Sequence, residues 1–198
     1  MFGTVSITDK IHVYPNELLA FSEASLLNKN VNSKCSRSSL HILKERISEK
    51  YINKVIKNVG LVISLVEFDY VDHAVIDSDD GSLYFNTTFR IIVFKPFISE
   101  IIEGIVINSD STGLTVSLGF FNDIKIPSNE LREPKSMNGD TKLWSWNYET
   151  HQLYYLINSI IRFRVTGVLF NDSDTEVSSM VIMGNVQNDG LGMISWWS

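Results

Sequence analysis

The chain has 198 residues, of which 44% are hydrophobic, so it can form a packed core and a wholly disordered chain is excluded. A single cysteine, Cys35, excludes an internal disulfide framework, and no apolar run approaches the roughly 20 residues that a membrane-spanning helix needs. The formal net charge is −6, the first ten residues lack the apolar segment of a secretory signal, and we expect a soluble, intracellular protein without membrane contact.

The amino-terminal part begins with weak signals and then has one strong helix signal. Residues 11–14 are typical of a short strand, Asn16 is a candidate cap for a short helix over 17–21, and the polar stretch 22–39 is typical of a solvated loop. Residues 40–59 are predicted to form a helix that ends at a glycine. Its apolar residues share one face at helical spacing: Leu40, Leu43, Ile47, Tyr51 and Val55.

Two strands follow that helix, with an acidic loop between them. Residues 61–68 are apolar and β-branched, as in a central strand, and 83–93 alternate apolar and polar side chains. The loop 72–81 suggests a calcium site, but position 12 of an EF-hand counted from Asp77 is Thr88 instead of the required Glu. We therefore predict a solvated loop, and a helix laid across a small antiparallel sheet.

A second domain is predicted to begin after Pro96, which has no N–H for a strand ladder and so ends the first sheet. Short strands separated by turn signals follow, and a polar segment over 128–141 bridges two of them. The predicted strands cover residues 101–107, 114–118, 124–126, 143–148, 152–156, 160–170, 180–186 and 193–197. We expect residues 1–96 and 97–198 to be separate domains, the second a small closed barrel of five or six antiparallel strands.

Catalysis finds little support in the sequence. The four histidines are scattered singly, and none has the spacing of a zinc ligand pair. The chain contains no nucleophile elbow, no phosphate-binding glycine loop and no dinucleotide fingerprint. We predict a non-catalytic protein with no metal or cofactor.

A surface for single-stranded nucleic acid is more credible. OB-fold barrels stack bases on aromatic side chains, at about 1–3 kcal/mol per base, while basic side chains follow the backbone. The candidates are Phe120, Phe121, Lys125, Arg162 and Arg164. One of the two phenylalanines is expected in the barrel core, and the arginines are alternatively partners of nearby carboxylates.

Residues 94–131, FKPFISEIIEGIVINSDSTGLTVSLGFFNDIKIPSNEL, resemble the junction and S1-type OB-fold of a known family. This family is the stalk subunit of multisubunit RNA polymerases, which includes the seventh-largest subunit of RNA polymerase II and its archaeal counterpart. The phrases SLGFF at 117–121, WSW at 144–146 and NDGLGMISWW at 188–197 are most similar to the RNA polymerase III member. The resemblance covers nearly the whole chain except about residues 22–39.

The resemblance implies an α+β amino-terminal tip domain, truncated and RNP-like, followed by an all-β OB-fold/S1-like barrel. It implies a nuclear, non-catalytic subunit of RNA polymerase III that forms a heterodimer with the smaller stalk subunit and supports initiation. The tip loop would dock on the polymerase core near the clamp, which makes Asp79, Asp80, Gly81 and Ser82 candidate docking residues, and the barrel would contact nascent RNA. Alternatives are the equivalent subunit of RNA polymerase II or I, a free-standing S1-type RNA-binding protein, and a barrel that serves only as a protein platform.

The sequence departs from the S1 pattern where that pattern has its usual contacts. Thr112 and Thr115 stand in place of aromatic residues, and Pro127 stands in place of a common histidine. Residues 97–198 also hold 6 Lys+Arg against 12 Asp+Glu, whereas phosphate contacts require basic surface. We therefore expect RNA contact by the isolated chain to be weak.

Overall fold

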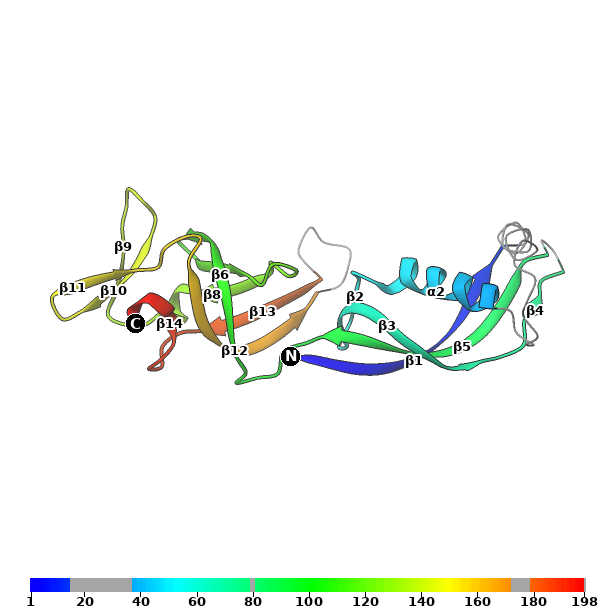
Figure 1. Cartoon of the computed structure of the whole chain (residues 1–198). Coiled ribbons are helices and arrows are strands. Elements are labelled where there is room, and N and C mark those ends of the chain that lie inside the picture. The colour runs from blue at the N-terminus through cyan, green and yellow to red at the C-terminus, as the bar shows by residue number, and fades with distance from the viewer. Residues whose placement is uncertain (15–36, 79–80, 172–178, 198) are drawn as a thin grey trace. The chain divides into compact units, whose positions relative to one another are not determined.

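The computed structural model describes residues 1–14, 37–78, 81–171 and 179–197 (Figure 1). Asp79, Asp80, Cys35, the predicted helix over 17–21 and most of the predicted loop lie outside the described residues. The chain divides into two compact units, one formed by Phe2–Phe94 and the other by Lys95–Ser198 with Met1. The first unit contains one sheet, and the second contains two.

The first unit is an antiparallel sheet in the order β1-β5-β3-β2, with β4 also paired to β5. The strand bounds are β1 (Phe2–Val13), β2 (Val55–Ile56), β3 (Gly60–Val71), β4 (Val75–Ile76) and β5 (Leu83–Phe94). The alternation predicted for residues 83–93 is confirmed, since Phe89, Ile91 and Val93 are buried. β1 begins well before the predicted strand at 11–14 because the whole stretch pairs with β5, from Phe2↔Phe94 to Val13↔Leu83.

Helix α2 (Arg37–Tyr51) lies on one face of this sheet, as predicted (Figure 1). Its residues Ile42, Leu43 and Ile47 are buried in one core cluster with residues of β1, β3 and β5. The predicted end of the helix is wrong, because the chain turns at Asn53 (φ 60°), whose N–H donates to Val62 at 3.0 Å. Residues 55–56 then form β2 instead of a last helical turn.

The second unit contains a closed barrel of five strands paired in the cycle β6-β7-β8-β13-β12 and back to β6. The strands are β6 (Ile101–Asp110), β7 (Gly113–Ser117), β8 (Ile124–Pro127), β12 (Ile160–Phe170) and β13 (Met180–Asn185). The predicted small closed barrel is confirmed in this form. The expectation of uniformly antiparallel pairing is wrong, because β13 pairs in parallel with β8.

The strand predicted over 193–197 is also largely wrong. Only β14 (Gly192–Met193) pairs with β12, and the chain then forms the 3₁₀ turn η2 (Ile194–Trp196). Gly192 has φ +103°, and a Cβ there would lie 2.5 Å from the Trp196 ring. The glycine therefore lets Trp196 fold back against the strand instead of extending it.

Inward-facing side chains fill the barrel core. They include Ile102, Val106, Leu114, Val116, Ile124, Ile126, Ile161, Phe163, Val165 and Ile182. The alternate residues of the same strands face outward, among them Glu103, Lys125 and Arg162. This period of two places charged side chains on the outer surface of the barrel.

A three-stranded sheet is inserted between β8 and β12. After the 3₁₀ turn η1 (Ser128–Glu130) it comprises β9 (Lys135–Met137), β10 (Trp144–Tyr148) and β11 (His151–Tyr154), in the order β11-β10-β9. The predicted hairpin is confirmed by the pairing Tyr148↔His151. Throughout the described ranges, no helix is long and apolar enough to cross a membrane.

Candidate nucleic-acid interface

The two phenylalanines of the β7–β8 connection point in different directions. Phe120 is 49% exposed, whereas Phe121 is 6% exposed and belongs to the core, as expected for one of the pair. The loop is held by Leu118 N–H donating to the Phe121 carbonyl at 2.9 Å and Gly119 N–H donating to Ser117 Oγ at 2.9 Å. Of these two rings, only Phe120 offers a surface for stacking.

Lys125 stands on the outer face of β8 between two buried isoleucines. Its neighbours across the ladders are Thr115 on β7 and Met183 on β13. These residues line a surface pocket of about 310 Å³ together with Asp110 and Thr112. Pro127 also lines it, so the three positions that depart from the S1 pattern meet in one pocket without an aromatic side chain.

A carboxylate shares this pocket with Lys125. Asp110 accepts hydrogen bonds from the Thr112 hydroxyl, from Thr112 N–H at 2.8 Å and from Gly113 N–H at 3.2 Å. The pKa of Asp110 lies below its ordinary range. The hydrogen bond from the Thr112 hydroxyl lowers it most, and the Thr112 and Gly113 N–H groups and the positive charge of Lys125 lower it further. Asp110 is therefore negatively charged near neutral pH, and this charge beside Lys125 opposes phosphate binding.

The two arginines lie on the outer face of β12. Arg162 donates to Glu103 on β6 through Nε at 2.9 Å and Nη2 at 2.7 Å, so the alternative of a carboxylate partner holds for this residue. Arg164 pairs in register with Asn185, and its Nε is buried with no hydrogen-bond partner among the described residues. Only part of the Arg164 side chain is thus presented at the surface.

The candidates spread across the barrel instead of gathering at one point. Strand β13 separates β8, which carries Lys125, from β12, which carries Arg164. Neighbouring strands are about 4.8 Å apart, so β8 and β12 are about 10 Å apart across the sheet. Arg164 is also offset along the strands, because it pairs with Asn185 whereas Lys125 pairs with Met183. Phe120 lies near the Met180 end of β13 and Arg164 near its Asn185 end, because Ile124 pairs with Ile182 and Arg164 with Asn185.

An aromatic cluster on the inserted sheet was not singled out as a site by sequence reasoning. The Arg132 guanidinium lies 4.2 Å from the centre of the Trp146 ring and 5.5 Å from that of Trp197. Trp146 also packs on Tyr148 and Trp196, at 4.9 and 5.6 Å between ring centres. The density of aromatic residues at 144–148 and 196–197 is the signal that could have indicated it.

Of the four candidate docking residues, the structure describes Gly81 and Ser82. Gly81 is exposed with φ +71°, and its N–H donates to the Asp77 carbonyl at 3.0 Å. Ser82 is buried, and its carbonyl accepts from Asp77 N–H at 2.8 Å, so these contacts shape the turn. The same loop exposes Val75 by 59% and Ile76 by 69%, which sequence reasoning did not identify.

No group of three or more His, Cys, Asp or Glu side chains in the described ranges could hold a metal ion. The features that remain are a closed barrel, its outer basic residues and a loop with an exposed aromatic ring. The strand order and the parallel β8–β13 pair are compatible with an OB-fold. The fold and site thus define a two-unit protein with a small helix-containing unit and a closed five-stranded barrel.

Comparisons with known proteins assign the chain within that class. A family model described as RNA polymerase III subunit Rpc25 matches residues 100–179. DNA-directed RNA polymerase III subunit RPC8 of Bos taurus is 35% identical over 175 residues, which cover 78% of this chain and 86% of the bovine protein. The chain belongs to the family of RNA polymerase III subunit RPC8.

Two yeast proteins show how the family extends. RPC8 of Saccharomyces cerevisiae is 31% identical over 192 residues, covering 81% of this chain and 91% of the yeast protein. RNA polymerase II subunit RPB7 of the same yeast is 26% identical over 154 residues, covering 77% and 85%. The bovine and yeast RPC8 proteins are thus more identical to this chain than yeast RPB7 is.

Proposed function

We propose that this chain is the non-catalytic stalk subunit of nuclear DNA-directed RNA polymerase III and supports transcription initiation. The observation that supports this most directly is the 35% identity to bovine RPC8 over most of both chains, compared with 26% to yeast RPB7. Tagging the chain, purifying it from nuclear extract and identifying the largest co-purifying subunit tests this. We expect the largest subunit of RNA polymerase III; that of polymerase II or I would contradict the proposal.

The partner within the enzyme is proposed to be the smaller stalk subunit, in a 1:1 heterodimer. The first unit, a helix on an antiparallel sheet, is proposed to be the truncated RNP-like tip domain of residues 1–96. Co-expression of the two subunits followed by size-exclusion chromatography with light scattering tests the pairing. Elution of two separate monomers would count decisively against it.

Docking on the polymerase core near the clamp is assigned to the loop between β3 and β5. Asp79, Asp80, Gly81 and Ser82 remain the proposed docking positions, and the exposed Val75 and Ile76 extend them. Val75 and Ile76 form the short strand β4 within this connection, and covering their exposed apolar surface with a partner would be favourable. They therefore supply an apolar contact that the acidic residues alone lack.

Contact with nascent single-stranded RNA is assigned to the barrel of residues 97–198. Phe120 would stack a base, Lys125, Arg162 and Arg164 would approach phosphates, and Phe121 would support the loop from the core. Glu103 and Asp110 oppose this binding locally, and the barrel half carries a surplus of acidic residues. RNA affinity is therefore expected to be low outside the assembled polymerase.

A further inference from the structure

Two aromatic rings of the second unit are half-exposed on either side of a buried indole. Tyr148 on β10 is 49% exposed and Trp197, which follows η2, is 45% exposed, whereas Trp146 is 7% exposed. The ring centres of Trp146 and Tyr148 lie 4.9 Å apart, and those of Trp146 and Trp197 lie 6.5 Å apart. Both exposed rings therefore pack on the same buried ring.

Hydrogen bonds hold the two indoles in place. Trp146 Nε1 donates to the Glu133 carbonyl and Trp197 Nε1 donates to the Leu191 carbonyl, both at 3.2 Å. Tyr148 is the last residue of β10, directly before the turn that leads into β11. Side chains that are already held lose little conformational freedom when a partner binds, and Trp, Tyr and Arg are enriched among the residues that dominate protein interfaces.

The cluster already binds one guanidinium group of its own chain. The Arg132 guanidinium lies 4.2 Å from the centre of the Trp146 ring and 5.5 Å from that of Trp197. The face of an aromatic ring attracts a cation, and the planar guanidinium of arginine stacks on such a face. The exposed surface of Tyr148 and Trp197 offers the same chemistry to a guanidinium from outside the chain.

The charge beside these rings is negative where it is not compensated. The two basic side chains of this region, Arg132 and Lys135, are each paired with a carboxylate. Glu149 follows Tyr148 directly, is exposed and has no ion-pair partner in the described ranges. Residues 97–198 as a whole hold 6 Lys+Arg against 12 Asp+Glu. The surface therefore combines exposed rings with an uncompensated carboxylate.

We propose that Tyr148, Trp197 and Glu149 bind an arginine-bearing segment of a partner polypeptide. One guanidinium would stack on an exposed ring, and a second would approach Glu149, whose Cα is about 3.8 Å from that of Tyr148. Charge complementarity selects this occupant, because the carboxylate attracts a guanidinium and repels an acidic segment. The role is separate from the proposed RNA contact, whose candidate residues lie on β8, β12 and the β7–β8 connection.

RNA fits this surface less well, although aromatic rings also stack bases. Phosphate groups require basic partners, and both Arg132 and Lys135 are already engaged by carboxylates. The acidic surplus of this half of the chain, moreover, repels a polyanion and attracts a cationic segment. An arginine-bearing segment uses both the rings and the carboxylate.

The test is a titration of the isotope-labelled full chain, followed by nuclear magnetic resonance. The probe is a capped five-residue peptide with two arginines. A matched peptide with citrulline, which keeps the shape of arginine without its charge, and an oligouridylate of five nucleotides are titrated in parallel. We expect the arginine peptide to shift the Trp197 indole N–H signal and the backbone signals of Tyr148 and Glu149, and to bind at least about threefold more tightly than either comparison ligand.

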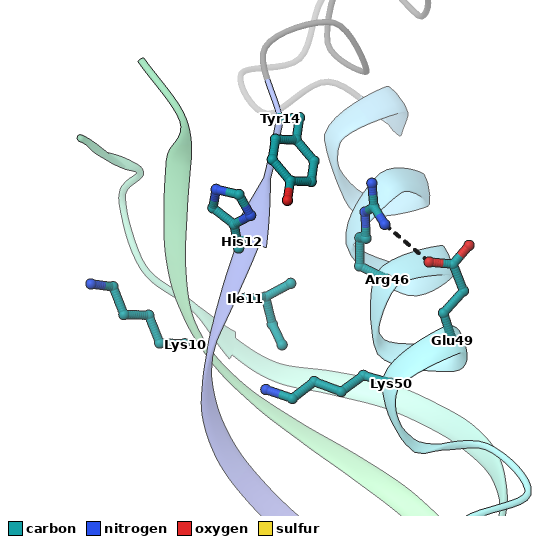
Figure 2. A pocket seen from close by; sticks show the side chains of 7 residues that line it. All are labelled: Lys10, Ile11, His12, Tyr14, Arg46, Glu49 and Lys50. Atoms are coloured by element: carbon teal, nitrogen blue, oxygen red, sulfur yellow. Dashed lines mark hydrogen bonds and ion pairs between the residues drawn. The ribbon is translucent and has the colours of Figure 1, made fainter. Parts of the chain in front are cut away.

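The first unit provides an internal reference for this titration. Lys10 and His12 line a surface pocket of about 320 Å³ together with Arg46 and Lys50, so their surroundings are rich in basic side chains (Figure 2). Their signals should not move when the arginine peptide is added. Shifts there as large as those at Tyr148 would mean non-specific binding and would contradict the assigned site.

Three further outcomes would overturn the proposal. The first is equal or tighter binding of the citrulline peptide or of the oligouridylate, and the second is no shift at millimolar arginine peptide. The third is a concentration-dependent shift of the same signals without any ligand, because this would identify a second copy of the chain as the occupant.

Variants locate the binding on the molecule. Glu149→Gln removes the uncompensated carboxylate and is expected to weaken the arginine peptide about two- to fivefold, and Tyr148→Leu removes an exposed ring with an effect of the same order. Asp140→Asn removes an exposed carboxylate from the connection between β9 and β10 and is the matched control, which should leave the affinity unchanged. Equal weakening by Glu149→Gln and Asp140→Asn would mean only a general charge effect and would contradict the site. Thermal unfolding of each variant checks that the fold is kept.

Discussion

Arg162 and Glu103 lie directly opposite each other on β12 and β6, and the arginine donates to the same carboxylate oxygen through both Nε and Nη2. The side chains are 40% and 49% exposed. An exposed ion pair of this kind contributes about 0–1 kcal/mol, so an RNA phosphate can compete with Glu103 for the guanidinium. Glu103 therefore limits the proposed RNA contact without abolishing it.

The first prediction removes this competition. Glu103→Gln should increase RNA crosslinking to the barrel in assembled polymerase, by up to about fivefold, because releasing a pair worth about 0–1 kcal/mol changes an equilibrium by up to that factor. Arg162→Glu should decrease it. Crosslinking of transcribing complexes followed by peptide mapping measures both effects.

The matched control for this prediction is Asp140→Asn, which makes the same change in net charge at an exposed site away from β12. It should leave crosslinking unchanged. If Asp140→Asn increased the crosslink as much as Glu103→Gln did, the effect would come from net charge, and Arg162 would be removed from the site.

The second prediction concerns docking by the loop between β3 and β5. Val75→Ser combined with Ile76→Ser should lower recovery of the polymerase core severalfold while the heterodimer with the smaller stalk subunit persists, because each replacement removes exposed apolar surface that a partner would cover. Val66→Ser, at an exposed aliphatic residue on β3, is the control. Quantitative affinity purification gives the ratio of core to heterodimer, and an unchanged ratio for the double variant would exclude this loop from docking.

The end of α2 shows why some local structure could not be predicted. Tyr51 and Val55 have the spacing of one helical face. Val55 nevertheless lies in a strand, where it pairs with Leu61 and is partly buried. Apolar spacing over one turn does not distinguish these two environments. The alternation of β5 was predictable because Phe89, Ile91 and Val93 recur at every second position, and burial alternates from Thr87 to Val93.

In the candidate site, too, some features could be predicted from the sequence and others could not. That one phenylalanine at 120–121 would enter the core could be expected from the sequence, and Phe121 does so. Which carboxylate meets Arg162, in contrast, depends on the register of β12 against β6, which are far apart in sequence. The pocket around Lys125 likewise depends on the parallel pairing of β8 with β13. Such long-range pairings are tertiary properties that local patterns do not encode.

The third prediction concerns acid stability of the first unit. Desolvation acts to raise the pKa of Asp9, but hydrogen bonds from Lys50 at 2.6 Å and the Tyr51 hydroxyl at 2.7 Å outweigh it, so the pKa lies below its ordinary value of 3.8. A depressed folded-state pKa contributes stability above the unfolded value, and this is lost as pH falls through the folded value. Asp9→Asn should therefore lower the free energy of unfolding at pH 7 and flatten its decline below about pH 4. Urea denaturation at a series of pH values measures this, and an unaltered acid slope would contradict the assignment.

The fourth prediction tests packing of the barrel core at Gly184 on β13. A Cβ at this position would lie 2.7 Å from Cδ2 of the fully buried Phe163 and 3.3 Å from Ile126. Gly184→Ala should therefore force the Phe163 ring to move, and overpacking of this kind costs about 1–3 kcal/mol. Gly167→Ala on β12 is the control, since nothing lies within 4 Å of a Cβ there. Chemical denaturation should show a loss of stability for Gly184→Ala alone, and equal stability of the two variants would mean that the ring has room to adjust.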